Sequence, residues 1–301
     1  MFIKTEYRGE WLTLFSFLLW GIAPLYFQQL GELPVPIIFA SRILMTLPLL
    51  VIALLFLKGR TLRLPKPAQA GWALLGAVLV STSWLGNLWG AVNGQLLAVS
   101  LAFFLSPLLT IAISMVIFQE RFSKRQMISF AICTLAFVFY CFANGALPWL
   151  TLVIAIAFAL YGVVKRKGQV SELGGLTAEV LLMLPVSLWI LGGSAFGASG
   201  FNGSESTNID LITSNHWLWL IAPVYYLPLM LYGIGVRSIR QMSTAGMMTY
   251  VEPVIMYALA LTVFNEPVSP MKQMAMLMVW GGILLQFPFG VFMMKRRSAL
   301  S

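Results

Sequence analysis

Three ionisable residues lie deep inside otherwise apolar stretches of the chain: Arg42, Glu179 and Glu252. A charged side chain in the middle of a membrane-spanning helix costs about 2.5–3.5 kcal/mol on insertion scales, so each should face a cavity or a partner. Glu252 stands beside Pro253, which removes a backbone hydrogen bond and interrupts a helix. Charges in such places bind solutes or exchange protons. We therefore predict that Glu252 is the ionisable centre of a binding site near the bilayer midplane.

Aromatic and polar side chains near these charges could complete the site, because aromatic rings attract cations and polar groups fix the orientation of a solute. The candidate substrate-binding residues are Glu252, Tyr250, Arg42, Glu179, Trp84, Asn87, Tyr161 and Lys165. A structural alternative stays open for Glu252, in which a neighbour such as Lys165 or Tyr250 holds its carboxylate in place and the residue has no role in flux.

Arg42 and Glu179 occupy matching places in the two halves of the chain, each six residues before a proline, Pro48 or Pro185. We predict that both act in one gating or binding network. A static pair that latches a gate and direct contact with a solute are both open. Their depths in the membrane differ by about 10 Å at a rise of about 1.5 Å per residue, which argues against a permanent bridge.

Residues suited to catalysis are scarce. His216 is the single histidine and Asp210 the single aspartate, and both lie in a long Gly/Ser-rich connector at 192–216. No nucleophile–base pair, metal-ligand cluster or phosphate-binding loop can be assembled inside the apolar stretches. We expect neither an enzyme nor a cofactor or metal.

The composition places most of the chain in lipid. Apolar residues make up 59% of the 301 residues, charged residues only 10%, and the mean hydropathy is +0.88. A soluble fold needs far more polar surface. The net charge of +9 would suit nucleic acid only on a water-soluble body, which this composition excludes.

Ten stretches are long and apolar enough to span a bilayer, for which about 20 residues are needed. They cover residues 11–28, 34–57, 67–90, 94–118, 123–142, 148–165, 174–192, 217–236, 243–264 and 269–294. Gly86, Gly90 and Gly94 lie at intervals of four residues in the third stretch, where they would let another helix approach closely.

Lysine and arginine gather at one side of these spans. If the N-terminus is cytoplasmic, 17 of the 19 basic residues fall at cytoplasmic ends, whereas Lys272 falls at an outer end and Arg42 inside a span. Cytoplasmic loops of membrane proteins carry an excess of Lys and Arg. Both termini are therefore predicted to be cytoplasmic.

The two halves of the chain repeat each other. At a fixed offset of 146 residues, Pro107 matches Pro253, Phe118 matches Phe264, Glu120 matches Glu266 and Ser123 matches Ser269. Since each half holds five spans, an odd number, the second copy enters the membrane in the opposite orientation. Such inverted repeats give transporters two related conformations around a midplane site. We predict an all-α membrane protein of ten transmembrane helices in two inverted five-helix repeats, at 1–146 and 147–301; duplication without such motion is the alternative.

The chain resembles the EamA-type drug/metabolite transporters, specifically the RarD (chloramphenicol-sensitive protein) subgroup. The resemblance is carried by SWLGNLWGAVNG at 83–94, SLAFFLSPL, FQERFS at 118–123, YGVVKRK at 161–167, LTAEVLLMLP at 176–185, TYVEPV at 249–254 and FNEPVS at 264–269. It implies two EamA repeats in a bacterial inner membrane. Three departures leave the substrate open: Ser83–Trp84 replaces the usual Asn-Trp, Glu252 replaces a small residue, and no acidic residue stands near Ala98.

We expect an inner-membrane permease or exporter that moves a small amphipathic metabolite, amino acid or drug by alternating access. The driving force is open between proton antiport through Glu252 and facilitated diffusion. Expected partners are the solute, the lipid bilayer and protons, with no nucleic acid, and a monomer is favoured. The alternative is a non-transporting membrane receptor or assembly subunit.

Overall fold

The computed structural model describes residues 8–30, 33–56, 65–119, 124–145, 147–168, 172–192, 215–238 and 248–286. Over these ranges the chain is helical and contains no strand, which confirms the predicted all-α class. The helices are α1 (Arg8–Gln28), α2 (Val35–Phe56), η2 (Pro67–Gln69), α3 (Ala70–Val92), α4 (Leu96–Phe118), α5 (Lys124–Asn144), α6 (Trp149–Gly168), α7 (Glu172–Gly192), η4 (His216–Leu220), α9 (Ile221–Ser238), α11 (Val251–Thr262) and α12 (Pro270–Gln286).

The helices follow the predicted spans in order and, within a few residues, in their ends. Those from α1 to α7 have 20 to 23 residues each. At about 1.5 Å per residue this is a length of about 30–35 Å, which matches the hydrocarbon core of a bilayer. Arg8–Gln28 and Pro67–Val92 qualify as membrane spans by length and composition alone. Most of the predicted connector at 192–216, the start of the span at 243–264 and the end of the span at 269–294 lie outside the described residues.

Large apolar side chains cover the outward surfaces of the helices. Val116 is 81% exposed, Phe142 77% and Leu135 66%. Soluble monomers rarely expose large contiguous apolar patches, because water solvates them poorly. The outside of this bundle is therefore suited to contact with lipid.

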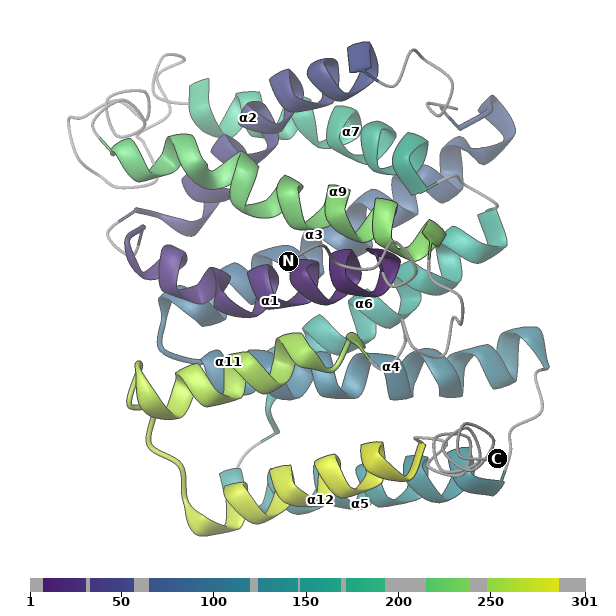
Figure 1. Cartoon of the computed structure of the whole chain (residues 1–301), viewed down its shortest axis with the longest axis vertical. Coiled ribbons are helices and arrows are strands. Elements are labelled where there is room, and N and C mark those ends of the chain that lie inside the picture. The colour runs from purple at the N-terminus through teal and green to yellow at the C-terminus, as the bar shows by residue number, and fades with distance from the viewer. Residues whose placement is uncertain are drawn as a thin grey trace, which may run out of the picture.

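The helices lie side by side in successive layers (Figure 1). α2, α7 and α9 form one end, α1, α3 and α6 come next, α4 lies with α11, and α5 and α12 form the other end. The most extensive pairings join α1 with α9, α5 with α12, α3 with α6 and α4 with α6. Further pairings join α2 with α7, α1 with α11, α4 with α11, α2 with α9 and α3 with α7.

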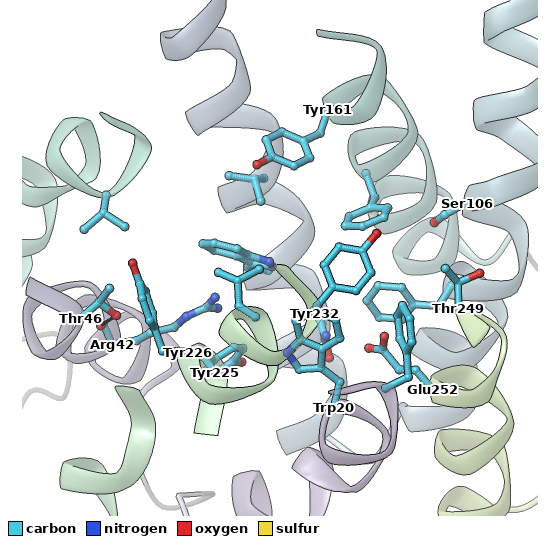
Figure 2. A pocket seen from close by; sticks show the side chains of 18 of the residues that line it. Trp20, Arg42, Thr46, Ser106, Tyr161, Tyr225, Tyr226, Tyr232, Thr249 and Glu252 are labelled. Carbon is cyan, nitrogen blue, oxygen red and sulfur yellow. Dashed lines mark hydrogen bonds between the residues drawn. The ribbon is translucent and has the colours of Figure 1, made fainter. Parts of the chain in front are cut away.

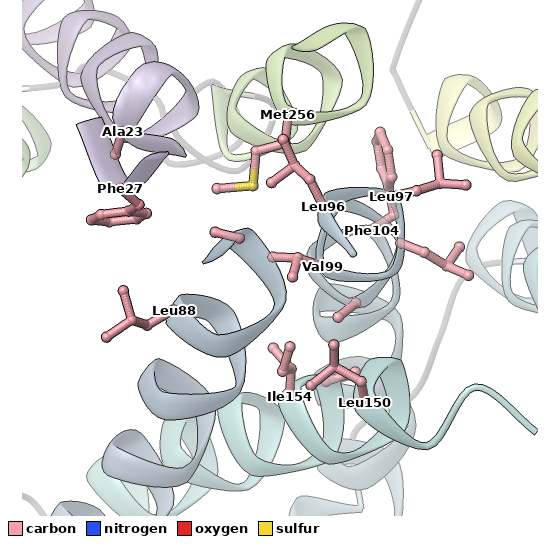
Figure 3. Close-up of a cluster of buried hydrophobic side chains, with 14 of the residues drawn as sticks. Ala23, Phe27, Leu88, Leu96, Leu97, Val99, Phe104, Leu150, Ile154 and Met256 are labelled. Carbon is pink, nitrogen blue, oxygen red and sulfur yellow. The ribbon is translucent and has the colours of Figure 1, made fainter. Parts of the chain in front are cut away.

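The main apolar core surrounds the turn between α3 and α4 (Figure 3). Its members include Phe27, Leu88, Leu96, Val99, Leu150, Ile154 and Met256, all at most 2% exposed. Glu266, in the segment between α11 and α12, accepts hydrogen bonds from the backbone N–H groups of Leu96 (2.5 Å) and Leu97 (2.9 Å). These donors belong to the first turn of α4 and have no partner within the helix. Core and cap together hold α3, α4 and the segment after α11 against one another at this end of the bundle.

Glycines set the closest helix approaches. A Cβ on Gly86 would lie 2.7 Å from Ile154 of α6, and one on Gly90 would lie 2.4 Å from Val99. The predicted close approach on this helix is therefore confirmed at Gly86 and Gly90. It is wrong for Gly94, which lies in the turn after α3 with a φ of +65° and nothing near its missing Cβ. A left-handed φ of this kind suits glycine because other residues strain there.

Gly235 offers the sharpest test of this packing. A Cβ there would lie 2.8 Å from the Thr13 backbone nitrogen and 2.9 Å from the Gly9 carbonyl oxygen, atoms that cannot rotate away. We expect Gly235→Ala to lower the stability of the bundle by about 1–3 kcal/mol, as overpacking does. Thermal unfolding in detergent measures this. Gly162→Ala on α6 is the matched control, because open space surrounds that site; equal unfolding temperatures for both variants would contradict the close α1–α9 contact.

Candidate functional site

A cavity of about 380 Å³ lies among the helices (Figure 2). Its lining comes from α1, α2, α3, α4, α6, α7, α9 and α11 together with Thr249, and includes no residue of α5 or α12. Five of the predicted site residues line it: Arg42, Trp84, Asn87, Tyr161 and Glu252. The other three, Glu179, Lys165 and Tyr250, are not among the lining residues.

Arg42 of α2 enters the cavity wall as a buried cation, only 6% exposed. Its guanidinium carbon lies 3.7 Å from the ring centroid of Trp84 and 3.4 Å from that of Tyr225. Aromatic rings this close stabilise a guanidinium by cation–π attraction. Two aromatic side chains of the cavity lining therefore stabilise the buried charge of Arg42.

Glu252 lies in the first turn of α11. Met248 is helical, Thr249 and Tyr250 form a turn, and α11 begins at Val251. Pro253 is thus the third residue of a helix, where its missing N–H breaks no intrahelical bond. The interruption expected at this proline lies just before it. The positive end of the helix dipole favours a carboxylate in this first turn.

No ion pair or hydrogen bond to the Glu252 side chain occurs within the described part of the chain. Lys165, one of the two partners considered for it, instead pairs with Glu179, with 2.8 Å between Nζ and Oε1. Tyr250, the other, stacks its ring on Phe104 with centroids 6.5 Å apart. The structural alternative for Glu252, a carboxylate held by one of these two side chains, is therefore not what the structure contains.

Glu179 is the centre of a second, neutralised cluster. It is 1% exposed, it receives the ion pair from Lys165, and the Tyr161 hydroxyl donates a hydrogen bond of 2.9 Å to its Oε2. Gly76 of α3 makes room, since a Cβ there would lie 3.1 Å from Glu179 Oε1. Arg42 and Glu179 are therefore not ion-paired here. Tyr161, which both binds Glu179 and lines the cavity, connects the cluster to the site.

Several lining residues were not among the predicted site residues. The main ones are Phe17 and Trp20 of α1 and Tyr225, Tyr226 and Tyr232 of α9. The α9 tyrosines recur at spacings of a helical face in the run YYLPLMLY, and this periodicity could have identified them. The Asn87 Oδ1 and the Tyr226 hydroxyl are buried without a hydrogen-bond partner in the described structure. Buried polar groups normally have partners, so these are ready to bind polar groups of a solute.

Comparison with known proteins agrees with this architecture. Residues 7–142 match the EamA-like transporter family. An uncharacterised transporter named YojE from Bacillus subtilis is 29% identical over 97% of this chain and 97% of its own length. Proteins named RarD are 27% identical in Salmonella typhimurium, over 98% of this chain and 99% of that protein, and 28% identical in Escherichia coli, over the same shares.

A solved crystal structure has the same fold. Its chain is only 16% identical, but it superposes with a TM-score of 0.58 over 93% of this chain and 97% of its own. The matching family description and the end-to-end similarity to proteins named RarD agree with the motifs in the sequence. In sequence the chain is therefore similar to the EamA-like transporter family over residues 7–142 and to proteins named RarD over nearly its whole length.

Proposed function

We propose that the protein is an inner-membrane permease that moves a small amphipathic solute through the cavity by alternating access. The observation that carries the proposal is the cavity itself, to which helices of both halves contribute and in which Arg42 and Glu252 are both exposed to a solute. Ligand sites of transporters with internal repeats lie between the repeats. Because the cavity lies within one chain, we propose that a monomer is the transporting unit.

Helix pairing supports two repeats related by a two-fold axis, α1–α5 and the set α6, α7, α9, α11 and α12. Under this correspondence the α1–α9 pairing is equivalent to α6–α3, α1–α11 to α6–α4, and α2–α9 to α7–α3, and all six pairings occur. Two pairs of residues separated by the offset of 146 are also in contact with each other. Contacts of this kind are expected for equivalent residues that lie close to a two-fold axis. Phe104 stacks on Tyr250, and the Cys133 thiol lies 3.7 Å from the Val279 carbonyl oxygen. With five helices in each repeat, the repeats are inverted.

The packed core at one end of the bundle supports alternating access. Glu266 and the α3–α4 turn lie on the side assigned to the outside by the Lys and Arg distribution, and the core packs tightly there. A transporter must seal one side while the site communicates with the other. Flux of a broad metabolite mixture into proteoliposomes tests the proposal; no flux of any solute would favour a receptor or assembly subunit.

Both termini are proposed to be cytoplasmic. A reporter that is active only in the cytoplasm should be active when it is fused after Ser301. Loops rich in Lys and Arg remain on the cytoplasmic side of the membrane, and the C-terminal segment is one of them. The connector at 192–216 should react with a membrane-impermeant label in intact cells. Activity of an export-dependent reporter at Ser301, or protection of the connector, would reverse the topology.

Glu252→Gln should reduce transport of an amine-bearing solute tenfold or more, equivalent to about 1.4 kcal/mol. The change keeps the shape of the side chain and removes the charge that faces the cavity. If Glu252 exchanges a proton for solute, the variant should also lose the dependence of flux on pH between about pH 6 and 8. Initial rates in proteoliposomes measure both effects.

Glu10→Gln is the matched control for Glu252. Glu10 also lies in the first turn of its helix, α1, but does not line the cavity. It should transport as the wild type does. Normal transport by Glu252→Gln across the same pH range would show that the carboxylate is not part of the transport site.

Lys165, Glu179 and Tyr161 are proposed to support the site as one unit. Lys165→Ala and Glu179→Ala should each abolish most flux, because either change leaves the other charge buried without its partner. Since the residues are in contact, the double variant should be no worse than the poorer single variant. Strictly additive losses would contradict a shared role.

Tyr161→Phe removes only the hydroxyl that binds Glu179 and should reduce flux more mildly than the charge variants. Tyr140→Phe on α5 is the control, because Tyr140 is buried away from the cavity lining. Adding Arg42→Ala to Glu179→Ala tests the predicted network of these two residues. Additive losses there would show that Arg42 and Glu179 act independently.

A further inference from the structure

The first turn of α11 carries Glu252 but is weakly stabilised by its own residues. Its N-cap residue, Tyr250, makes no side-chain hydrogen bond to the helix, although a capping side chain normally satisfies one of the free N–H groups there. The backbone bond from the Val254 N–H to the Tyr250 carbonyl oxygen is 3.3 Å long, beyond the usual range of about 2.7–3.2 Å. Contacts with other helices therefore have to hold this turn in place.

One face of α4 supplies such contacts. The hydroxyl of Ser100, a residue with 0% exposure, donates a hydrogen bond of 2.8 Å to the Pro253 carbonyl oxygen. Phe104 lies four residues further along α4, on the same face, and stacks on Tyr250 with ring centroids 6.5 Å apart and ring planes inclined by 18°. Since Tyr250 and Pro253 flank Glu252 in the sequence, α4 holds the chain on both sides of this carboxylate.

α1 limits the movement of the same turn from a second side. A Cβ on Gly21, which is buried, would lie 2.8 Å from the Cβ and 2.9 Å from the Cδ1 of Ile255. Real Cβ atoms do not approach this closely, so α1 and α11 are as close here as glycine allows. The start of α11 is thus packed between two helices of the first half of the chain.

The residues that make these α4 contacts do not line the cavity, whereas Glu252 does. Building on the proposed transport site, we infer that Ser100 is a positioning residue for Glu252. Its hydroxyl anchors the first turn of α11 and thereby holds the carboxylate at the cavity. Ser100 itself contacts no solute, so its whole effect on transport passes through Glu252.

Chemical modification of Glu252 tests the positioning without any measurement of flux. Dicyclohexylcarbodiimide is an apolar reagent that reacts with carboxylic acids in apolar surroundings, and mass spectrometry of the purified full chain in detergent gives the rate at Glu252. Ser100→Ala should slow this modification about threefold or more, because a turn that has lost its anchoring hydrogen bond holds the carboxylate at the cavity for less of the time.

Ser129→Ala is the matched control. Ser129 also has 0% exposure, and its hydroxyl donates a hydrogen bond of 2.6 Å to the Gly282 carbonyl oxygen, between α5 and α12. Neither residue lines the cavity. This variant also loses a buried hydrogen bond between two helices, but its Glu252 should be modified at the rate of the wild type.

Transport tests whether Ser100 acts through Glu252. Ser100→Ala alone should reduce the initial flux of an amine-bearing solute about threefold or more. When it is added to Glu252→Gln, it should reduce flux no further, because the effects of coupled residues are not additive.

Other results overturn the inference. Unchanged or faster modification of Glu252 in Ser100→Ala would show that the hydroxyl does not position the carboxylate. Equal slowing in Ser129→Ala would show a general effect of lost packing. Strictly additive losses of flux would show that Ser100 acts independently of Glu252. If modification follows the expected pattern but the wild type transports no solute, the positioning is supported and the transport proposal is refuted.

Discussion

The burial of charge inside an apolar bundle is the constraint on which this architecture depends. Lipid and packed side chains cannot solvate an ion, so each buried charge has to be stabilised by a helix end, an aromatic face or an opposite charge. The protein uses all three means. Glu252 stands at the N-terminus of α11, Arg42 lies between Trp84 and Tyr225, and Glu179 pairs with Lys165. The two charges that are stabilised without an opposite charge, Glu252 and Arg42, both line the cavity.

The two buried glutamates illustrate different solutions to the same constraint. Glu179 is neutralised by Lys165 and bound by Tyr161, so its charge is already satisfied within the protein. Glu252 has a favourable helix dipole but no counterion among the described residues. A helix dipole is equivalent to about half a charge, which stabilises a carboxylate without neutralising it. This difference is why Glu252 is proposed as a direct contact and Glu179 as its support.

The helices divide into a cavity-forming group and one outlying pair. α5 and α12 supply no lining residue and instead pack on each other at small side chains. The Ser129 hydroxyl donates a hydrogen bond of 2.6 Å to the Gly282 carbonyl, and a Cβ on Gly282 would lie 2.6 Å from the Cys133 sulfur. Close backbone approach of this kind is typical of helix pairs in membranes. The pair is therefore a distinct packing unit beside the helices that enclose the cavity.

Hydropathy and charge can be read directly from the sequence. The features of the protein that depend on these two properties were therefore predictable from the sequence alone. The order and ends of the helices, the all-α class and the residues whose charges need stabilising all follow from the cost of placing polar groups in lipid. The motifs also indicated the resemblance to EamA-type transporters, and residues 7–142 match the model of that family. Five of the eight predicted site residues do line one cavity, because buried polar side chains in such a bundle have few other places to go.

Only the tertiary structure decided which residue pairs with Glu179 and where the chain is interrupted before α11. Glu179 forms its ion pair with Lys165, which lies on α6, and not with Arg42, the residue that the sequence had grouped with it. No spacing in the sequence distinguishes the two candidate partners. Pro107 and Pro253 have unequal surroundings: α4 continues through Pro107, whereas a turn at Thr249 and Tyr250 precedes Pro253. In the first turn of α11, the Pro253 carbonyl accepts a hydrogen bond of 2.8 Å from the hydroxyl of Ser100 on α4. This contact joins residues 153 positions apart, and local sequence cannot specify which distant side chain will reach a given backbone group.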